Sequence, residues 1–327
     1  MSSTDQQIIS SPPSLIKSLM AGFDATSNHL GLILFSVTLD LLLWFGPRMR
    51  LVELFRPFLS GSGALPEIQD PEMTKALVAA LEQFNLFSVL RTLPIGVPSL
   101  MVSRAVLETP VSVPYLWELS SLGAASLLWL ALSAIGLAAG TLYFIAVSQA
   151  AILNKIDWRQ MFTSWPRAYL QIFYLTLFWF GLFVITVVPF SCLLTILLFT
   201  GFNINQVAMV VLLLFAGLLV WMLVPLFFSP HGIFVNQRTM WISVRDSVRL
   251  TRMTLPTTSL LLLVILVLSE GLDVLWSTPL PTSWFTLVGI AGHAFVTSSL
   301  LAASFIYYRD ADRWVQQILQ QAKLSVA

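Results

Sequence analysis

The stretch AYLQIFYLTLFWFGLFVITVVPFSCLLTILLFTGFNINQVAMVVLLLFAGLLVWMLVPLFFSPHGIFVNQ, Ala168 to Gln237, contains no Asp, Glu, Lys or Arg. A helix needs only ~20 consecutive apolar residues to cross the hydrocarbon of a bilayer, so this stretch is long enough for two crossings. Thr200 to Gln206, TGFNINQ, interrupts it with the Gly and Asn residues that tight turns favour. The stretch therefore predicts a hairpin of two transmembrane helices.

The rest of the chain has the same character. It is 57% hydrophobic and only 10% charged, with a mean hydropathy of +0.84, so it lacks the charged surface of a soluble protein of 327 residues. Lipid offers the backbone no hydrogen-bond partner, and the segments do not alternate as barrel strands do, so the spans should be helices. We predict an all-α polytopic membrane helix bundle with six transmembrane helices. They cover about 29–45, 119–147, 169–199, 204–228, 257–276 and 284–308.

Lys and Arg in the short loops indicate the orientation of these helices. Basic residues lie between the second and third spans, between the fourth and fifth, and after the sixth, whereas the turns at 200–206 and 277–283 carry no charge. We therefore expect a multi-pass protein of the cell membrane with both termini in the cytoplasm. Arg48, Arg50 and Arg56 oppose this orientation, but they begin a long loop that also holds acidic residues, and long loops cross membranes largely regardless of charge.

The expected organisation has five parts. Residues 1–28 form a cytoplasmic N-terminal segment that lacks the pattern of a cleaved signal peptide, and 29–46 form the first transmembrane helix. Residues 47–118 form an extracytoplasmic subdomain. Five membrane helices with cytoplasmic interfacial helices occupy 119–308, and 309–327 form a cytoplasmic tail.

The subdomain at 47–118 is the only sizeable polar region. Asp70-Pro71-Glu72 is typical of a helix start with an Asp N-cap, and the apolar residues that follow predict an amphipathic helix ending near Arg91. The next segment, 95–114, carries prolines and apolar residues without helical phase, so we expect it to lie extended against the outer headgroups. This surface is a candidate lid or a candidate docking site for a membrane protein partner.

Two cytoplasmic loops resemble each other. Trp158 is followed six residues later by Ser164, and Trp241 is followed six residues later by Ser247, each after an apolar segment with Asn. This pattern indicates a duplicated unit, as is common in membrane folds. Tryptophan beside basic residues favours helices in the headgroup plane, which we expect at 149–167 and 232–254.

The segment SVRDSVRLTR, Ser243 to Arg252, stands at the head of a span and follows GIFVNQ. It resembles the interfacial motif of bacterial six-span proteins related to the membrane domain that is fused to glycerophosphodiester phosphodiesterases. The resemblance covers roughly residues 120–310 and depends on Ser247, Leu250 and Arg252. It implies a helical membrane domain without assigned catalytic residues. The hydrolase domain is missing here and the long outer loop departs from compact members, so no function carries over.

Four ionisable residues fall in the outer half of the predicted spans: Asp40, Glu270, Asp273 and His293. A charge inside a span costs about 2.5 kcal/mol or more unless it is paired or faces water. One interpretation is structural: Asp40 accepts hydrogen bonds from Ser, Thr or an Arg such as Arg48, and His293 donates to a carbonyl. The other is functional: the four residues converge to bind a proton, a cation or a polar substrate group.

Arginines around the fourth and fifth spans form a second candidate site. They suit anionic lipid headgroups, at about 1 kcal/mol for each basic residue near the surface, or they serve only as positive-inside anchors. The residues are Arg238, Arg245, Arg249 and Arg252.

Other classes of function lack their motifs. A formal net charge of +1 without a basic and aromatic cluster argues against nucleic acid as a partner. The single cysteine, Cys192, cannot form an intrachain disulfide, and no nucleotide-binding, metalloprotease or serine hydrolase motif occurs, so we expect no enzyme activity, cofactor or metal. The leading hypothesis is a non-enzymatic module that binds membrane lipids or a partner protein. The alternative is a small transporter or permease subunit that uses the outer polar cluster.

Overall fold

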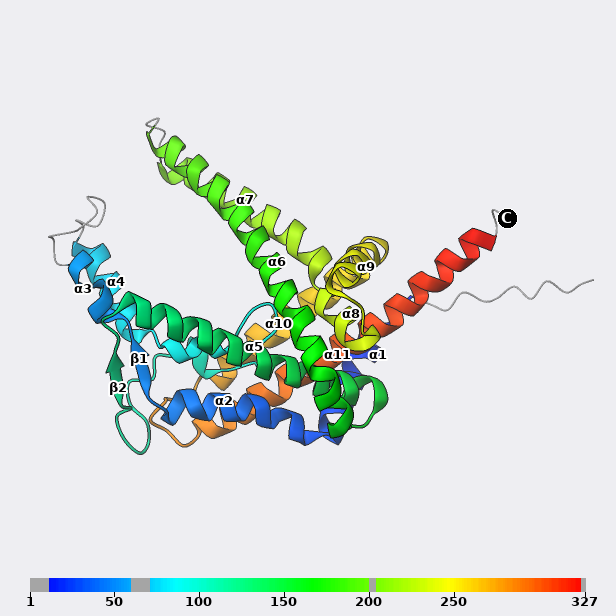
Figure 1. The fold of residues 1–327 in the computed structure, drawn as a ribbon, viewed down its shortest axis with the longest axis horizontal. Coiled ribbons are helices and arrows are strands. Elements are labelled where there is room, and N and C mark those ends of the chain that lie inside the picture. The colour runs from blue at the N-terminus through cyan, green and yellow to red at the C-terminus, as the bar shows by residue number, and fades with distance from the viewer. Residues whose placement is uncertain (1–11, 60–70, 200–203, 325–327) are drawn as a thin grey trace, which may run out of the picture.

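The computed structural model describes residues 12–59, 71–199 and 204–324, and these residues are almost all helical (Figure 1). Five helices within them are long and apolar enough to cross a membrane. The predicted all-α polytopic bundle is therefore confirmed. The five helices are α5 (Leu122–Leu153), α6 (Trp158–Phe199), α7 (Ile204–Leu226), α10 (Leu255–Trp276) and α11 (Thr286–Leu324).

A sixth span exists only as a bent pair. Helix α1 (Leu15–Asn28) joins α2 (Ile33–Phe45) through the short helix η1 (Leu30–Leu32), and the two arms differ in direction by 86°. The 13 residues of α2 extend ~20 Å at 1.5 Å per residue, which is short of a bilayer core of ~30 Å. The described residues thus contain five helices that could span a membrane, or six if the bent pair counts as one span.

Helix α1 falls within the predicted cytoplasmic N-terminal segment at 1–28, but it packs along α11. A Cβ on Gly22 would come within 2.5 Å of backbone atoms of Ser299 and Ala303, so only glycine allows this approach. The ring of Phe23 also contacts that of Phe295, with centroids 5.9 Å apart. The small residues of both helices explain the contact, because small side chains let helix backbones approach closely.

The core of the bundle is formed by α5, α11 and α2. More than half of the most apolar window of α5 and of α11 is buried, 56% and 61% respectively. Tyr143 of α5 bonds Ser298 of α11 with 2.9 Å between the two oxygens. The buried hydroxyls of Ser299 and Ser304 donate to carbonyls of their own helix, so these polar side chains cost little where lipid is excluded.

Helices α6 and α7 form the predicted hairpin, which projects away from the rest of the bundle (Figure 1). None of the most apolar window of α6 and only 6% of that of α7 is buried. Phe190 and Phe215 stack between the two helices with centroids 3.9 Å apart. The predicted turn at 200–206 falls partly outside the described residues.

The subdomain at 47–118 holds a small parallel sheet and several short helices. Strand β1 (Arg48–Arg50) pairs with β2 (Leu116–Glu118), so the start and end of the subdomain lie side by side. Helix α4 ends at Gln83, before the predicted limit at Arg91, because the next residues form a separate turn. Its predicted N-cap, Asp70, lies outside the described residues. The short helices are α3 (Val52–Leu59), α4 (Pro71–Gln83), η3 (Leu86–Leu90) and η4 (Met101–Ser103).

The segment that we expected on the outer headgroups instead enters the bundle. Ile95, Val97 and Leu100 are all buried, and they pack in the main core. Two glycines of α5 make room for this backbone: a Cβ on Gly136 would lie 2.4 Å from the carbonyl oxygen of Leu90, and Gly140 faces residues 95–96. The small residues of α5 thus accept a loop as well as a helix.

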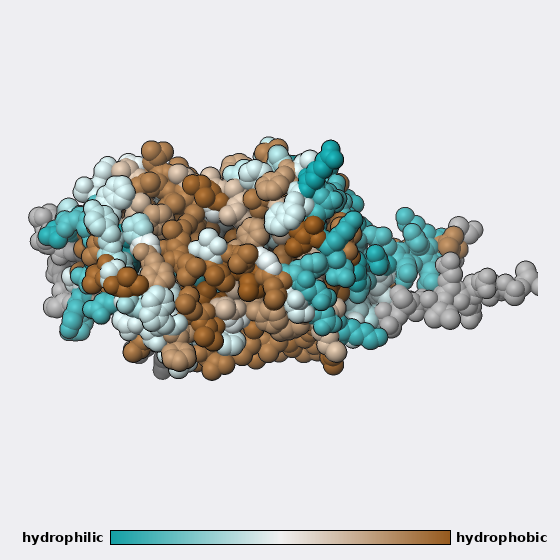
Figure 2. Space-filling view, turned by 90° about the horizontal axis from the view of Figure 1, so that it is seen from below, coloured by the Kyte–Doolittle hydropathy of each residue, from teal (hydrophilic) through white to brown (hydrophobic). Residues whose placement is uncertain are grey.

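Helices α8 (Ser229–Asn236) and α9 (Met240–Met253) occupy the range 232–254 expected for an interfacial helix. At 149–167 no separate interfacial helix forms, because α5 continues to Leu153 and α6 begins at Trp158. Seen from below, hydrophobic residues gather over the middle of the molecule and hydrophilic residues over both ends (Figure 2). This pattern is typical of a protein that crosses a membrane.

Candidate functional site

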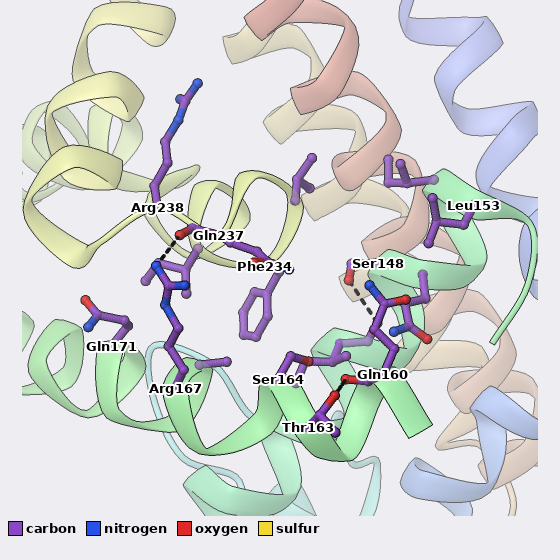
Figure 3. Close-up of a pocket in the computed structure, with 16 residues that line it drawn as sticks. Ser148, Leu153, Gln160, Thr163, Ser164, Arg167, Gln171, Phe234, Gln237 and Arg238 are labelled. Carbon is purple, nitrogen blue, oxygen red and sulfur yellow. Dashed lines mark hydrogen bonds between the residues drawn. The ribbon is translucent and has the colours of Figure 1, made fainter. Parts of the chain in front are cut away.

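A cavity of about 470 Å³ lies where the end of α5, the beginning of α6 and the end of α8 meet (Figure 3). Its size falls within the ~300–1,000 Å³ of typical ligand pockets. We call it the amide pocket because four glutamine side chains line it together with one arginine that has no acidic partner. These residues are Gln149, Gln160, Gln171, Gln237 and Arg167.

The turn between α5 and α6 builds one wall of the amide pocket. Asn154 ends α5 in the left-handed region, with φ of 50°, and the chain reverses there. The backbone N–H of Asp157 donates to Oε1 of Gln149 over 3.0 Å, and the Asp157 carboxylate accepts from the N–H of Gln160 over 3.0 Å. Asp157 therefore caps the start of α6, and its two hydrogen bonds fix the positions of Gln149 and Gln160 beside the pocket.

The opposite wall is formed where α8 ends. Gln237 has a φ of 49°, and its carbonyl accepts a hydrogen bond from Arg167 Nη2 over 3.1 Å. The backbone N–H of Met240 donates to Oε1 of Gln171 over 2.8 Å. The side-chain oxygens of Gln149 and Gln171 thus both accept a hydrogen bond from a backbone N–H group. The N–H₂ groups of these two glutamines are the donors left for a ligand.

The charge of the amide pocket comes from Arg167. Arg238 also lines it, but its guanidinium points away (Figure 3) and pairs with Asp246 at 3.0 Å and Asp312 at 3.1 Å. Burial by itself lowers the pKa of Arg238, but Tyr308, Asp312 and Asp246 together raise it. Arg167 forms no ion pair among the described residues, and no acidic side chain lines the pocket. The pocket is therefore rich in donors and carries one uncompensated positive charge.

The remaining lining is apolar. Ile145 and Ile233 lie at the buried side, and Phe234 points into the space between the polar walls (Figure 3). An amphiphilic ligand would find both donors and hydrocarbon contacts here. This site could not be predicted from the sequence, because glutamine in or beside an apolar run gives no motif. The only signal was the repeated apolar-Asn and Trp pattern: the chain is left-handed at the Asn of the first copy, Asn154, and one residue after the Asn of the second, at Gln237.

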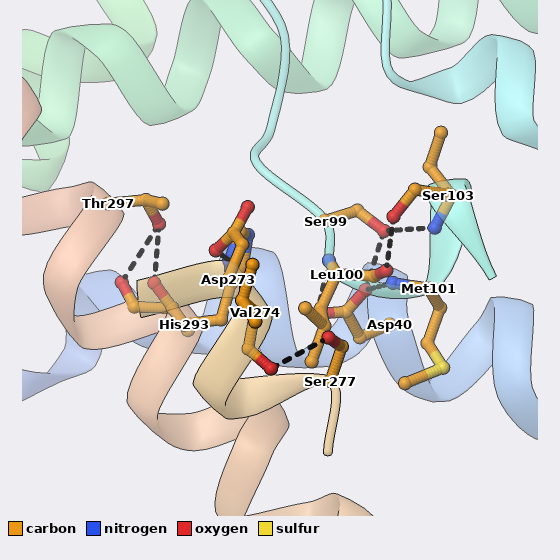
Figure 4. A network of polar contacts seen from close by, with 12 residues as sticks. Asp40, Ser99, Leu100, Met101, Ser103, Asp273, Val274, Ser277, His293 and Thr297 are labelled. Carbon is orange, nitrogen blue, oxygen red and sulfur yellow. Dashed lines mark hydrogen bonds and ion pairs between the residues drawn. The ribbon is translucent and has the colours of Figure 1, made fainter. Parts of the chain in front are cut away.

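Asp40, the first residue of the predicted outer cluster, is completely buried and holds the loop that enters the bundle (Figure 4). Its carboxylate accepts from Ser99 Oγ over 2.5 Å and from the backbone N–H groups of Met101, over 2.9 Å, and Leu100, over 3.2 Å. Arg48, which we considered as a partner, donates elsewhere, to the carbonyls of Val106 and Gln83. Asp40 thus anchors the start of η4.

Two other members of that cluster pair with each other. Nδ1 of His293 lies 2.6 Å from Oδ1 of Asp273, and Nε2 of the same ring is buried with no hydrogen-bond partner among the described residues. Glu270 is exposed and takes no part in this contact. None of Asp40, Asp273 and His293 lines the amide pocket.

The predicted lipid-contact arginines divide into two kinds. Arg238 is held by its two carboxylates, whereas Arg245, Arg249 and Arg252 are exposed along α9. Trp241 lies on the same side of α9 by helical spacing and has 68% of its surface exposed. Three of the four arginines therefore remain accessible to headgroups.

No family model, curated protein or solved structure matches the chain. Within the described residues, no three His, Cys, Asp or Glu side chains are grouped as metal ligands would be.

Proposed function

We propose that this protein is a non-enzymatic membrane module that binds the headgroup of an anionic lipid in the amide pocket. The pocket itself supports the proposal, since donors and one unpaired guanidinium lie beside apolar side chains at the end of membrane-spanning helices. A lipid phosphate would accept from Arg167 and from the amides of Gln149 and Gln171, while its acyl chains lie along the apolar helices.

The exposed face of α9 supports the same function. Arg245, Arg249 and Arg252 give about 1 kcal/mol each near an anionic surface, and Trp241 is a residue that prefers the membrane interface. This helix would keep the end of the bundle in an anionic leaflet, where the amide pocket meets its ligand. The charge distribution of the loops favours a cytoplasmic location for this end, and we infer that both termini lie on the same side.

The test is native mass spectrometry of the protein released from its membrane, with bound phospholipid measured after delipidation and addition of phosphatidylglycerol. We expect Arg167→Gln to lower the bound fraction about tenfold. Arg159→Gln is the matched control, because Arg159 is exposed on the same helix and does not line the pocket. Equal thermal unfolding of the three proteins shows that folding is unchanged. Equal lipid binding by wild type and Arg167→Gln would refute the proposal.

Transport remains the second candidate because of one observation, the buried His293 ring whose Nε2 has no partner among the described residues. A pair formed by His293 and Asp273 inside spans is the kind of group that proton relays use. Loss of proton-coupled uptake in His293→Gln, with folding intact, would favour this function over lipid binding.

A protein partner at 47–118 also stays a prediction. Several apolar side chains at the end of this subdomain are exposed, and they suit either a partner or the headgroup region. They include Leu107, Val111, Val113, Tyr115 and Trp117.

A further inference from the structure

The subdomain contains a second, smaller cavity of about 60 Å³, at the opposite end of the bundle from the amide pocket. One buried water needs about 10–15 Å³ of such space, so this cavity has room for a few waters or one small ion. Its polar lining comes from β1, from the residues around η3 and from the residue that follows η4. These side chains are Arg48, Gln83, Asn85, Ser88 and Arg104.

Both arginines of this cavity are fixed by carbonyl oxygens. Arg48 has only 2% of its surface exposed, and its two terminal nitrogens donate to the carbonyls of Val106 and Gln83. Arg104 donates from Nη2 to the carbonyl of Ser277 over 3.0 Å and to that of Pro279 over 2.5 Å. Neutral acceptors orient the guanidiniums but do not compensate their charge.

No carboxylate provides that compensation. Arg48 and Arg104 form no ion pair among the described residues, and none of the residues that line the cavity is acidic. Arg50 adds a third guanidinium nearby and its one acidic partner, Glu118, is 3.9 Å away. Burial lowers the pKa of Arg48 and of Arg104, and Arg50 lowers that of Arg48 further.

Arg104 also has one unused donor. Its Nη1 is buried and has no hydrogen-bond partner among the described residues. An unpaired buried donor on a charged group is costly, so native structures supply it with a protein group, a water or a ligand. Arginine is the residue that proteins use most for bidentate contacts with oxyanions.

We propose that the cavity between Arg48 and Arg104 binds a phosphate-type oxyanion. The anion accepts from Nη1 of Arg104 and from the second hydrogens of the Arg48 terminal nitrogens, while Asn85 and Ser88 border it. Arg48 and Arg50 lie on the outer side in the predicted orientation, where basic residues are not expected. An anion site at this end gives a reason for their presence. Free phosphate and the headgroup of a phospholipid share this chemistry.

The experiment measures binding of radiolabelled inorganic phosphate, and of short-chain phosphatidic acid, to the full-length protein in detergent. Arg104→Gln should weaken binding at least tenfold. Ser88→Leu should also weaken binding at least tenfold although both arginines remain, because the larger leucine side chain would fill the cavity. Arg91→Gln is the control, since Arg91 is exposed in the same subdomain outside the cavity. Arg167→Gln should leave this site unchanged, which separates it from the amide pocket.

The two probes identify the source of the anion. Binding of inorganic phosphate that depends on Arg104 and Ser88 supports a soluble anion as the ligand. Binding of phosphatidic acid alone, with the same dependence, supports a lipid headgroup. The proposal is wrong if neither probe binds, or if both bind equally well to wild type, Arg104→Gln and Ser88→Leu.

Discussion

Helix α11 and helix α7 both span the membrane, yet their environments are opposite. In α11, 61% of the most apolar window is buried inside the protein, whereas in α7 only 6% is. Of the five long helices, α11 is the least hydrophobic and α7 the most. The more apolar helix is therefore the one that the protein leaves uncovered.

The residue types explain this difference. Half of the buried residues of α11 are Ala, Ser, Gly or Thr, and the hydroxyls of Ser299 and Ser304 donate to carbonyls of the same helix. The exposed side of α7 consists of Leu, Val and Trp. Lipid tails are as apolar as leucine, so large apolar residues gain little from protein neighbours, whereas small residues gain close packing. High hydropathy thus marks contact with lipid, and small residues mark contact with protein.

The largest expected effect is at Asp40, in the packed part of the molecule. Asp40→Ala leaves three buried donors without their acceptor, those of Ser99, Leu100 and Met101, at about 1–3 kcal/mol each. We expect the free energy of unfolding to fall by at least about 3 kcal/mol. Reversible unfolding in mixed micelles measures it. Glu270→Ala, at an exposed carboxylate, should change it by less than ~0.5 kcal/mol.

The next effect compares two glycines in membrane helices. Gly136→Ala places a Cβ 2.4 Å from the carbonyl oxygen of Leu90, so backbone must move, and we expect a loss of about 1–3 kcal/mol. Gly181→Ala in α6 meets nothing within 4 Å and should be neutral or stabilising, because alanine favours helix. The midpoint of thermal unfolding of the two variants gives the comparison. A similar decrease in the midpoint for both variants would contradict the absence of neighbours around Gly181 in α6.

A smaller effect is expected where α9 meets α7. Ser247 donates from Oγ to the carbonyl of Pro225 over 2.7 Å, and it is buried. Ser247→Ala should cost about 1 kcal/mol, the usual value of a buried hydrogen bond. The exposed Ser191 of α6 bonds only its own helix, so Ser191→Ala is the matched control, with little change expected in the same unfolding measurement.

The smallest effect is expected at Leu213 in α7, which has 62% of its surface exposed. Leu213→Ala should change the free energy of unfolding by less than ~0.5 kcal/mol, because no protein cavity forms. Leu300→Ala in α11, where only 2% of the leucine is exposed, should cost about 2 kcal/mol or more in the same assay. Equal losses would mean that another protein surface covers the hairpin.

Much of the fold could be predicted from uncharged runs, because hydropathy reports the solvent of a segment. The five long helices follow from it, as does the α6–α7 hairpin. The bend of 86° between α1 and α2 could not be predicted, since no proline or charged residue lies at the break itself, from Asn28 to Ile33. The burial of Ile95 and Val97 was also missed, because an apolar loop has the same composition on a membrane surface and inside a bundle.

The candidate sites were harder to predict for the same reason. Asp40 was recognisable as a charge in an apolar run. Its partners lie about 60 residues away in a loop, so they could not be identified from spacing along the chain. His231 is buried against Phe228 and bonds Ser304 over 2.8 Å, and its sequence context beside Pro230 at the end of an apolar run indicates neither partner. The amide pocket depends on backbone turns at Asn154 and Gln237, which only the three-dimensional structure reveals.

The contact between α1 and α11 joins the first described helix of the chain to the last. At a synthesis rate of ~5–20 residues per second, the ribosome needs roughly 15–60 s to make the chain between Gly22 and Ala303. During that time the small-residue face of α1, with Gly22 and Ala25, has no native partner. The final docking of α1 must therefore follow the release or insertion of α11, so a nascent chain that stalls before α11 leaves this face open to chaperones and membrane proteases.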